Sequence, residues 1–295
     1  MLIGIAGRND QIAGTEYPFT GLIRGIKALG HDICISLPSK DSTFDDCDAV
    51  FTWNLASIPA WREMMAVIDR PVFIMERGWF DRDEYTQIDP SGFNHSASWA
   101  HEVTGPAPVG GAERYRMLAE RLSPRKRVES RPDGYALILG QTGIDEQLKQ
   151  SEIHHADALC DAVKASLPAG LDCAFRGHPL SKWRPKDMQT IDGTLDDALK
   201  YSRFVITINS NAGNDALWAG VPVLCLGPAL YEIAGAARRT TIATLLHDME
   251  FMCRGWEPDE KRVMSYFHWL SSRQWNREEL QKGDCLKQLL GDADG

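Results

Sequence analysis

The sequence predicts an α/β fold made of two facing Rossmann-like domains with a cleft between them. Short apolar strands alternate with helical segments in both halves, and a basic, proline-broken stretch separates the halves. The length of 295 residues suits two domains of roughly 150 residues each. We therefore expect a first domain over 1–122, a linker over 123–134, a second domain over 135–258 and a helical tail over 259–295 that packs back on the first domain.

In the first half, short apolar runs that end in polar residues predict strands at 2–7, 31–38, 48–53 and 71–76. Helical patterns separate them at 19–30, which Gly30 ends as a C-cap would, and at 57–68. The segment 78–111 is rich in glycine, proline and polar residues. We expect it to be a long irregular loop, and loops of that length are usually functional or mobile. A further helix is expected at 112–122.

The second half repeats the alternation. Strands are expected at 135–140, 171–179, 204–208 and 222–227, and helices at 155–167, 194–202 and 214–220. Because consecutive strands are joined through helices, they are expected to run parallel. The tail from about 259 is rich in charge and tryptophan and is expected to be helical.

Composition narrows the class of protein. The net charge is −9, so a polyanionic partner would need a local basic patch. No apolar run reaches the ~18 residues of a membrane helix, and the start MLIGIAGRND reads as a core strand rather than a signal peptide. The seven cysteines are odd in number and form no C-x-x-C pair, which indicates a reducing cytoplasm and argues against disulfides and a zinc knuckle.

The stretch FVITINSNAGNDALWAGVPVLCLG, 204–227, contains a buried strand that ends in small polar residues before a helix. Ligands of open parallel sheets bind beyond the carboxyl ends of the strands, and a helix start offers N–H groups to a phosphate. The expected phosphate-binding residues are Asn209, Ser210, Asn211, Ala212, Gly213, Asn214 and Asp215. The alternative is an ordinary strand-loop-helix turn in which Ser and Asn cap the helix.

Two more polar loops follow strands of the same half. His178 and Pro179 end the strand at 171–179, and Gln141, Thr142 and Asp145 follow the strand at 135–140. Three polar loops at one sheet edge form a plausible nucleotide site. The sequence lacks G-x-G-x-x-G and Walker motifs at these loops, so dinucleotide and P-loop chemistry are not supported.

The second half resembles glycosyltransferases of the capsule-polysaccharide type, the group that includes bacterial Kdo transferases. The resemblance runs from Tyr135 to Gly235 and rests on these residues in order: Gln141-Thr142 and Asp145, His178-Pro179, Ser210 and Gly213, Ala216-Leu217-x-x-Gly220-x-Pro222-Val223, Gly227 and Tyr231. In the first half, ERGW…DPSGFNHSAS at 76–98 is similar to a stretch of some capsule-synthesis proteins. Two positions depart from the pattern: Ile144 stands where glycine is usual, and Asp215 where glutamate is frequent.

This resemblance implies a GT-B fold and a nucleotide-sugar donor, UDP-, CMP- or other, with no tightly bound cofactor. It assigns donor binding to His178 and Ser210, together with Asn211 and Gly213, and links Asp145 to catalysis. Helix N-termini and His178 can meet the leaving phosphate without a metal.

Deprotonation of the acceptor hydroxyl requires a base, which we expect in the first half. The candidates are Glu76, Asp89, His95 and Glu16. Glu76 ends a strand, where its alternative role is a salt bridge to Arg77 or Arg82. Asp89 and His95 could simply belong to a solvated loop, and Asp145 could be a helix N-cap.

The acceptor is expected to be a glycan hydroxyl. Hydroxymethylated bases of phage DNA are a second possibility, because the basic residues Arg114, Arg116, Arg121, Arg125, Lys126, Arg127 and Arg131 could meet a DNA backbone. Two other functions stay open: a GT-B-type sugar-nucleotide epimerase, and a sugar-nucleotide-binding protein without catalysis.

Overall fold

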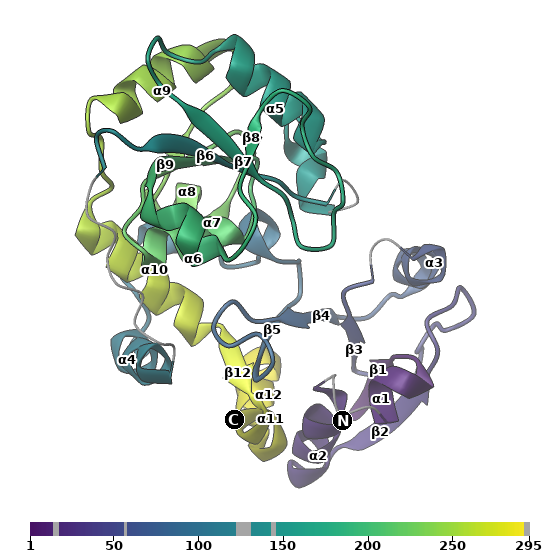
Figure 1. The fold of residues 1–295 in the computed structure, drawn as a ribbon. Coiled ribbons are helices and arrows are strands. Elements are labelled where there is room, and N and C mark those ends of the chain that lie inside the picture. The colour runs from purple at the N-terminus through teal and green to yellow at the C-terminus, as the bar shows by residue number, and fades with distance from the viewer. Residues whose placement is uncertain (14–17, 56–57, 122–130, 143–145, 292–295) are drawn as a thin grey trace. The chain divides into compact units, whose positions relative to one another are not determined.

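The computed structural model describes residues 1–13, 18–55, 58–121, 131–142 and 146–291 (Figure 1). The chain forms two compact units. Unit 1 comprises Met1–Ser98 and Leu270–Gly295, and unit 2 comprises Trp99–Trp269. Each contains one six-stranded sheet. No helix within the described ranges is long and apolar enough to cross a membrane.

The sheet of unit 1 has the strand order β12-β5-β4-β3-β1-β2. β1, β2, β3 and β4 run parallel, whereas β5 and β12 extend the sheet in antiparallel fashion. Every residue of β3 is buried, as expected for a central parallel strand. The strands are β1 Leu2–Ala6, β2 Asp32–Ser36, β3 Ala49–Trp53, β4 Val72–Arg77, β5 Tyr85–Asp89 and β12 Gln274–Asn276.

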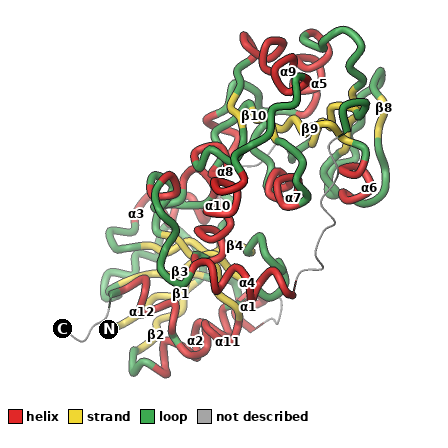
Figure 2. Tube along the Cα trace, turned by 90° about the vertical axis from the view of Figure 1, so that its left-hand side faces the viewer, coloured by secondary structure: helices red, strands yellow, loops and turns green. Residues whose placement is uncertain are grey.

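The helices of unit 1 are α1 Asn9–Ala13, α2 Phe19–Ala28, α3 Pro59–Val67, α11 Arg277–Lys282 and α12 Asp284–Leu290. α2 and α11 pack side by side although they lie at opposite ends of the chain (Figures 1 and 2). The side chain of Asn276 and that of Glu279 form a capping box that starts α11 immediately after β12. The C-terminal segment is therefore an integral part of this unit.

The sheet of unit 2 is entirely parallel, with the order β11-β10-β9-β6-β7-β8. Its strands are β6 Tyr135–Leu139, β7 Cys173–Arg176, β8 Gln189–Thr190, β9 Ser202–Thr207, β10 Val223–Cys225 and β11 Arg238–Arg239. The three central strands β10, β9 and β6 are almost wholly buried because helices cover both faces of the sheet.

The helices of unit 2 are α4 Gly111–Arg121, α5 Ala156–Ala165, α6 Leu195–Lys200, α7 Ala212–Trp218, α8 Leu230–Ile233, α9 Leu245–Cys253 and α10 Glu260–Ser272, whose last three residues belong to unit 1. α5 and α9 pack on one face through a core that contains Leu159, Val163 and Met249. α7 and α8 lie on the other face (Figure 1).

The predicted fold class is confirmed: both units are Rossmann-like α/β domains. Several elements were not predicted, among them α1, β8, α8, β11 and α9. The segment 78–111 contains a strand, β5, and the tail expected to be helical contains another, β12. The units also divide at other positions than the predicted boundaries: 99–121 groups with unit 2, where Tyr115 of α4 packs against Trp218 and Phe267.

Candidate functional site at the carboxyl edge of the second sheet

The three polar loops predicted to bind the donor follow three adjacent strands. β6 lies between β7 and β9, so the loop after β6 is flanked by the other two. Strands lie about 4.8 Å apart, which separates the ends of β7 and β9 by roughly 10 Å. The loops with Gln141, His178 and Ser210 therefore share one edge of unit 2, whereas Asp145 lies outside the described residues.

The loop after β6 is joined to the loop after β9 by a reciprocal amide pair. Gln141 Nε2 donates to Asn209 Oδ1 at 3.0 Å, and the Asn209 backbone N–H donates to Gln141 Oε1 at 2.9 Å. Asn209 Nδ2 also donates to the backbone carbonyls of Gln147 and Pro228. Both side chains are buried, so these two residues hold the sheet edge together. Thr142, the next residue, is half-buried.

Ser210 organises the start of α7. Its Oγ accepts a hydrogen bond from the Ala212 N–H at 3.3 Å, and its carbonyl accepts from the Gly213 N–H at 2.9 Å. The Asn214 N–H in turn donates to the Asn211 carbonyl at 3.0 Å. These helix-start amides thus already have protein partners, unlike the unpaired amides that the sequence interpretation assumed. The Ser210 hydroxyl keeps its own proton to donate.

Gly213 and Asn214 contact buried tyrosines. A Cβ on Gly213 would lie 2.7 Å from Cζ of Tyr231, so glycine is needed here for packing on that ring. The Tyr231 hydroxyl donates to the Ser210 carbonyl at 3.1 Å. Asn214 Oδ1 accepts from the Tyr266 hydroxyl at 2.6 Å, and its Nδ2 donates to Asn211 Oδ1 at 2.7 Å. Gly213 and Asn214 therefore link the start of α7 to the buried side chains of Tyr231 and Tyr266.

The remaining predicted residues of this helix are more accessible. Asn211 is exposed, and Ala212 and Asp215 are half-buried. Ser210 is buried, with 7% of its surface exposed. Of the predicted donor-binding set around α7, Asn211, Ala212 and Asp215 thus reach the surface.

His178 follows β7 and is held by its own turn. Its Nδ1 accepts a hydrogen bond from the Leu180 N–H at 3.2 Å, and its carbonyl accepts from the Ser181 N–H at 2.9 Å. His178 is half-buried and Pro179 is exposed. Because Nδ1 is an acceptor, the neutral ring has its proton on Nε2.

Glu232 of α8 is a candidate that the sequence interpretation missed. It directly follows Tyr231, and burial raises the pKa of its carboxyl group, against the lowering effects of Arg239 and of a backbone hydrogen bond from Ala229. Perturbed carboxyl groups near a ligand-binding edge are frequent in functional sites. Its signal in the sequence was its place at the start of the helix after β10.

Glu76 is the strongest acid-base candidate of unit 1. Asn54 Nδ2 donates to its Oε2 at 3.2 Å, and the Arg77 N–H donates to its Oε1 at 2.8 Å. Burial raises the pKa of this carboxyl group, although both hydrogen bonds and the charges of Arg82 and Arg77 oppose the rise. The Arg77 side chain pairs with Asp83 at 2.7 Å, while the positive charges of Arg82 and Arg77 both act on the Glu76 carboxyl group.

Asp89 accepts hydrogen bonds from one short loop. The N–H groups of Ser91, Gly92 and Ser98 and the Ser98 hydroxyl donate to it at 2.7 to 3.1 Å. The carboxylate is buried, and these donors occupy both of its oxygens. Asp89 therefore shapes the loop that contains His95, which is half-buried. Glu16, the fourth acceptor-side candidate, lies outside the described residues.

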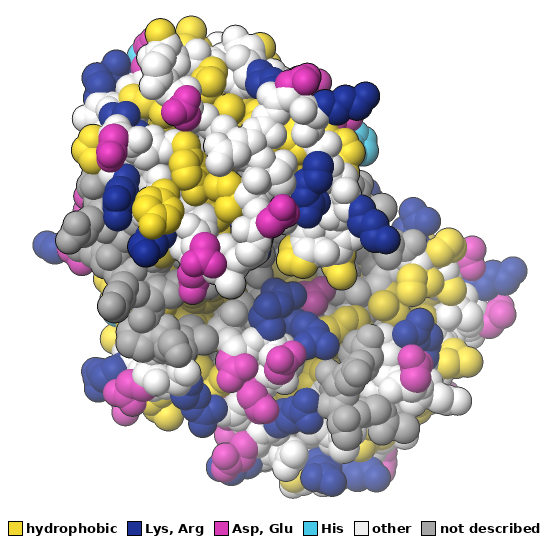
Figure 3. Space-filling model, in the orientation of Figure 1, with side chains coloured by type: hydrophobic (Ala, Val, Ile, Leu, Met, Phe, Trp, Pro, Cys, Tyr) yellow, Lys and Arg dark blue, Asp and Glu magenta, His cyan; other side chains and the backbone are white. Residues whose placement is uncertain are grey.

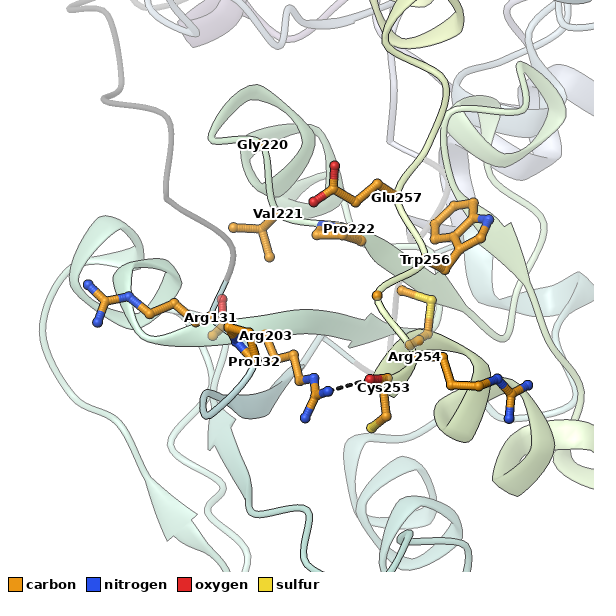
Figure 4. A pocket seen from close by; sticks show the side chains of 13 residues that line it. Arg131, Pro132, Arg203, Gly220, Val221, Pro222, Cys253, Arg254, Trp256 and Glu257 are labelled. Carbon is orange, nitrogen blue, oxygen red and sulfur yellow. Dashed lines mark hydrogen bonds between the residues drawn. The ribbon is translucent and has the colours of Figure 1, made fainter.

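A pocket of about 190 Å³ lies at the opposite edge of the second sheet, beside the first residues of β9 and the residues that precede β6 and β10 (Figure 4). Its three arginines are engaged in other contacts. Arg203 donates to the Cys253 carbonyl, while Arg131 lies over the Tyr201 ring at 5.2 Å and Arg254 over the Phe251 ring at 5.5 Å. Ligands of open parallel sheets bind at the carboxyl edge, so this pocket is not the expected donor site.

Comparison with known proteins finds a family match within unit 2 and solved structures with the same fold. The model of the family described as capsule polysaccharide biosynthesis protein matches residues 180–251. A search of curated protein sequences finds no match. Residues 180–251 include Ser210, α7 and Glu232 and begin two residues after His178.

Two solved structures share the fold. The beta Kdo 2,7 transferase of Thermosulfurimonas dismutans KpsC has a TM-score of 0.59 and 17% identity, over 97% of this chain and 99% of that chain. The beta Kdo 2,4 transferase of the same protein has a TM-score of 0.53 and 16% identity, over 91% and 98%. The resemblance inferred from the sequence is thus confirmed: residues 180–251 match the capsule polysaccharide biosynthesis family, and the chain has the fold of these two Kdo transferases.

Proposed function

We propose that this protein is a glycosyltransferase that moves a sugar from a nucleotide-activated donor to a hydroxyl group of a surface glycan. One observation supports this most: the segment that matches the capsule polysaccharide family forms part of the sheet edge where Ser210 and His178 converge, in a chain with the fold of Kdo transferases. Kdo is accordingly the first sugar to test, with CMP- and UDP-activated forms ahead of others.

On the donor side, Ser210 and His178 are proposed to bind the phosphate. The Ser210 hydroxyl is oriented by the Ala212 N–H, and the His178 ring by the Leu180 N–H. Side chains that are already oriented can stabilise a leaving group without reorganisation of the site. Gln141 and Asn209 join the loop after β6 to the loop that contains Ser210. We propose that no metal is required and that Asp145 contributes to catalysis, as in the resembling family.

On the acceptor side, Glu76 is proposed as the general base. A carboxyl group with a raised pKa is a better proton acceptor near neutral pH than an ordinary one. Asn54 orients it through the hydrogen bond to Oε2. Asp89 is proposed to act indirectly, by holding the loop of His95.

A glycan acceptor is favoured over modified DNA. Arg114, Arg116 and Arg121 of the basic run lie on α4, and Arg131 lies over Tyr201, whereas Arg125, Lys126 and Arg127 are outside the described residues. On the face drawn in Figure 3, the described Lys and Arg side chains are interspersed with Asp and Glu rather than gathered in one stripe. A polyanion-binding surface would need such a stripe.

The test is a thermal-shift screen with UDP-, GDP-, CMP- and dTDP-sugars, with magnesium and with EDTA, followed by a turnover assay with glycan acceptors. A donor at 100 times its Kd stabilises the native state by about 2.7 kcal/mol. We expect one nucleotide family to raise the midpoint in both buffers. Ser210→Ala and His178→Ala should abolish the shift, while the control variants Ser166→Ala and His247→Ala should keep it.

The alternatives give different results. Conversion of donor alone to an epimer would indicate the epimerase, and binding without turnover would indicate a non-catalytic protein. If the donor still raises the thermal midpoint of both Ser210→Ala and His178→Ala, this sheet edge does not bind the phosphate. A salt-sensitive gel shift with hydroxymethylated DNA would restore the DNA acceptor.

A further inference from the structure

The loop after β7 positions an arginine against the residue that precedes His178. Arg184 Nη1 donates to the Ser181 carbonyl at 2.9 Å and to the Trp183 carbonyl at 2.8 Å. A Cβ on Gly177 would lie 2.7 Å from the same nitrogen. The guanidinium group therefore lies on the bare backbone of Gly177, immediately before His178, and a side chain at position 177 would displace it.

The neighbouring residue anchors this loop to the sheet. The ring of Trp183 packs edge-on against Phe175 of β7, with centroids 5.3 Å apart and an interplanar angle of 90°. Phe175 is buried in the core, so the anchor is rigid. Two carbonyls and this aromatic contact thus hold Arg184 in place, which reduces the entropy that binding would otherwise cost.

Arg184 keeps hydrogen-bonding capacity toward solvent. Its side chain is 41% exposed, and its other terminal nitrogen, Nη2, lies 3.8 Å from Asp192 Oδ1. That distance is too long for a hydrogen bond, and the Asp192 side chain is 85% exposed. Such a loose surface ion pair is weak. The guanidinium fork can therefore exchange Asp192 for a phosphate, whose geometry it matches.

The adjacent histidine is oriented by its own turn, because Nδ1 of His178 accepts the Leu180 N–H. The Arg184 guanidinium group lies against Gly177, the residue before His178, and so places a positive charge beside this turn.

We propose that Arg184 binds the phosphate of the nucleotide-sugar donor beside His178 and neutralises the leaving group. This rests on the proposed function. As the bond from the anomeric carbon to the phosphate oxygen breaks, its electron pair stays on that oxygen. The Arg184 N–H groups stabilise the added charge by hydrogen bonding, without proton transfer. The anomeric carbon bonds to the acceptor oxygen, whose proton goes to the general base.

The experiment compares nucleotide with nucleoside by titration calorimetry. The probes are CMP, UDP, GDP and dTDP, each beside its nucleoside, on the full-length chain. For wild type, the ratio of nucleotide to nucleoside affinity reports the phosphate contacts. Arg184→Ala should lower this ratio at least about ten-fold and leave nucleoside affinity unchanged, as expected for the loss of charge-assisted hydrogen bonds. For Arg184→Lys, the ratio of nucleotide to nucleoside affinity should lie between those of wild type and Arg184→Ala, because lysine retains the charge without the guanidinium fork.

Two further variants separate this role from a structural one. Lys182→Ala removes an exposed charge from the same loop and should leave the ratio unchanged. Asp192→Asn removes the competing anion and should raise the ratio by roughly two- to five-fold, which loss of loop structure would not do. If wild type binds nucleotide and Arg184→Ala keeps the ratio, this inference fails and the proposed function stands. If wild type binds none of the nucleotides, the proposed function fails as well.

Discussion

The hydroxyl of Tyr266 donates a 2.6 Å hydrogen bond to Oδ1 of Asn214 inside unit 2. Asn214 is also hydrogen-bonded to Asn211, because its Nδ2 donates to Asn211 Oδ1 at 2.7 Å. Tyr266 and Asn214 are buried, while Asn211 lies exposed at the start of α7. A residue of α10 thus determines how a residue of the candidate donor loop is oriented.

Tyr266→Phe should therefore weaken both folding and donor binding. The variant leaves Asn214 Oδ1 buried without its donor, which costs about 1–3 kcal/mol in the free energy of unfolding. Urea denaturation measures that loss, and calorimetry with the preferred nucleotide should show a several-fold rise in Kd. Tyr201→Phe, at a half-exposed ring, is the control and should change neither quantity. Unchanged nucleotide affinity in Tyr266→Phe would limit Tyr266 to a structural role.

Glu76→Gln should change how stability depends on pH. Burial raises the pKa of Glu76 above its ordinary value of 4.5. Its contribution to stability is then fully present below that value and is lost as the pH rises through the folded-state pKa. Glutamine stays neutral, so this loss should disappear from urea midpoints measured between about pH 4 and about pH 8.

The same variant tests catalysis. A general base contributes 10²-fold or more to the rate, so glycosyl transfer by Glu76→Gln should fall by about 10²-fold. Glu63→Gln, on the exposed face of α3, should retain both the wild-type rate and the wild-type pH dependence. Wild-type turnover in Glu76→Gln would assign the base to another residue.

Gly213→Ala should destabilise unit 2. The new methyl group would meet the Tyr231 ring at 2.7 to 2.9 Å, and overpacking of this kind costs about 1–3 kcal/mol. Tyr231 would then also shift from the Ser210 carbonyl. In a Tyr231→Ala background the same substitution should cost much less, and a thermodynamic cycle of urea midpoints measures the difference. Equal costs in both backgrounds would contradict the packing role of Gly213.

Gly25→Ala and Gly21→Ala form a matched pair on α2. A Cβ on Gly25 would clash with the Leu280 carbonyl of α11, whereas one on Gly21 would meet its nearest atoms at 3.4 Å, an ordinary contact. We expect Gly25→Ala to lower the free energy of unfolding by about 1–3 kcal/mol. Gly21→Ala should raise it by about 0.5–1 kcal/mol through helix propensity. If both substitutions shift the thermal midpoint in the same direction, α11 does not pack on α2 through Gly25.

The alternation of strands and helices could be predicted because it depends on the local periodicity of apolar residues. The parallel strands β1, β3, β4, β6 and β9 are continuous apolar runs that any window of the sequence reveals. β5 and β12 were missed for a physical reason. Each is defined by pairing with a distant partner, Thr86 with Trp275 for example, and neither has an apolar pattern of its own.

The polar loops at the sheet edge could also be predicted from the local sequence pattern, but the direction of each side chain could not. Gln141 follows a strand and Asn214 lies in the first turn of α7, yet the amides of both bond to protein partners. Gly213 was expected to admit an anion and instead admits the Tyr231 ring. Arg184 was missed because its place beside Gly177 depends on how the loop folds back.

The helix α10 begins in unit 2 and ends in unit 1, and β12 and α11 follow it directly. Unit 2 is thus one uninterrupted segment inserted into unit 1, whose own segments come from the two ends of the chain. A premature stop codon soon after Trp269 would spare every residue of unit 2. It would remove the edge strand of the first sheet and the helix against which α2 packs, so a truncation within 270–295 should unfold unit 1, most of which precedes unit 2 in the sequence.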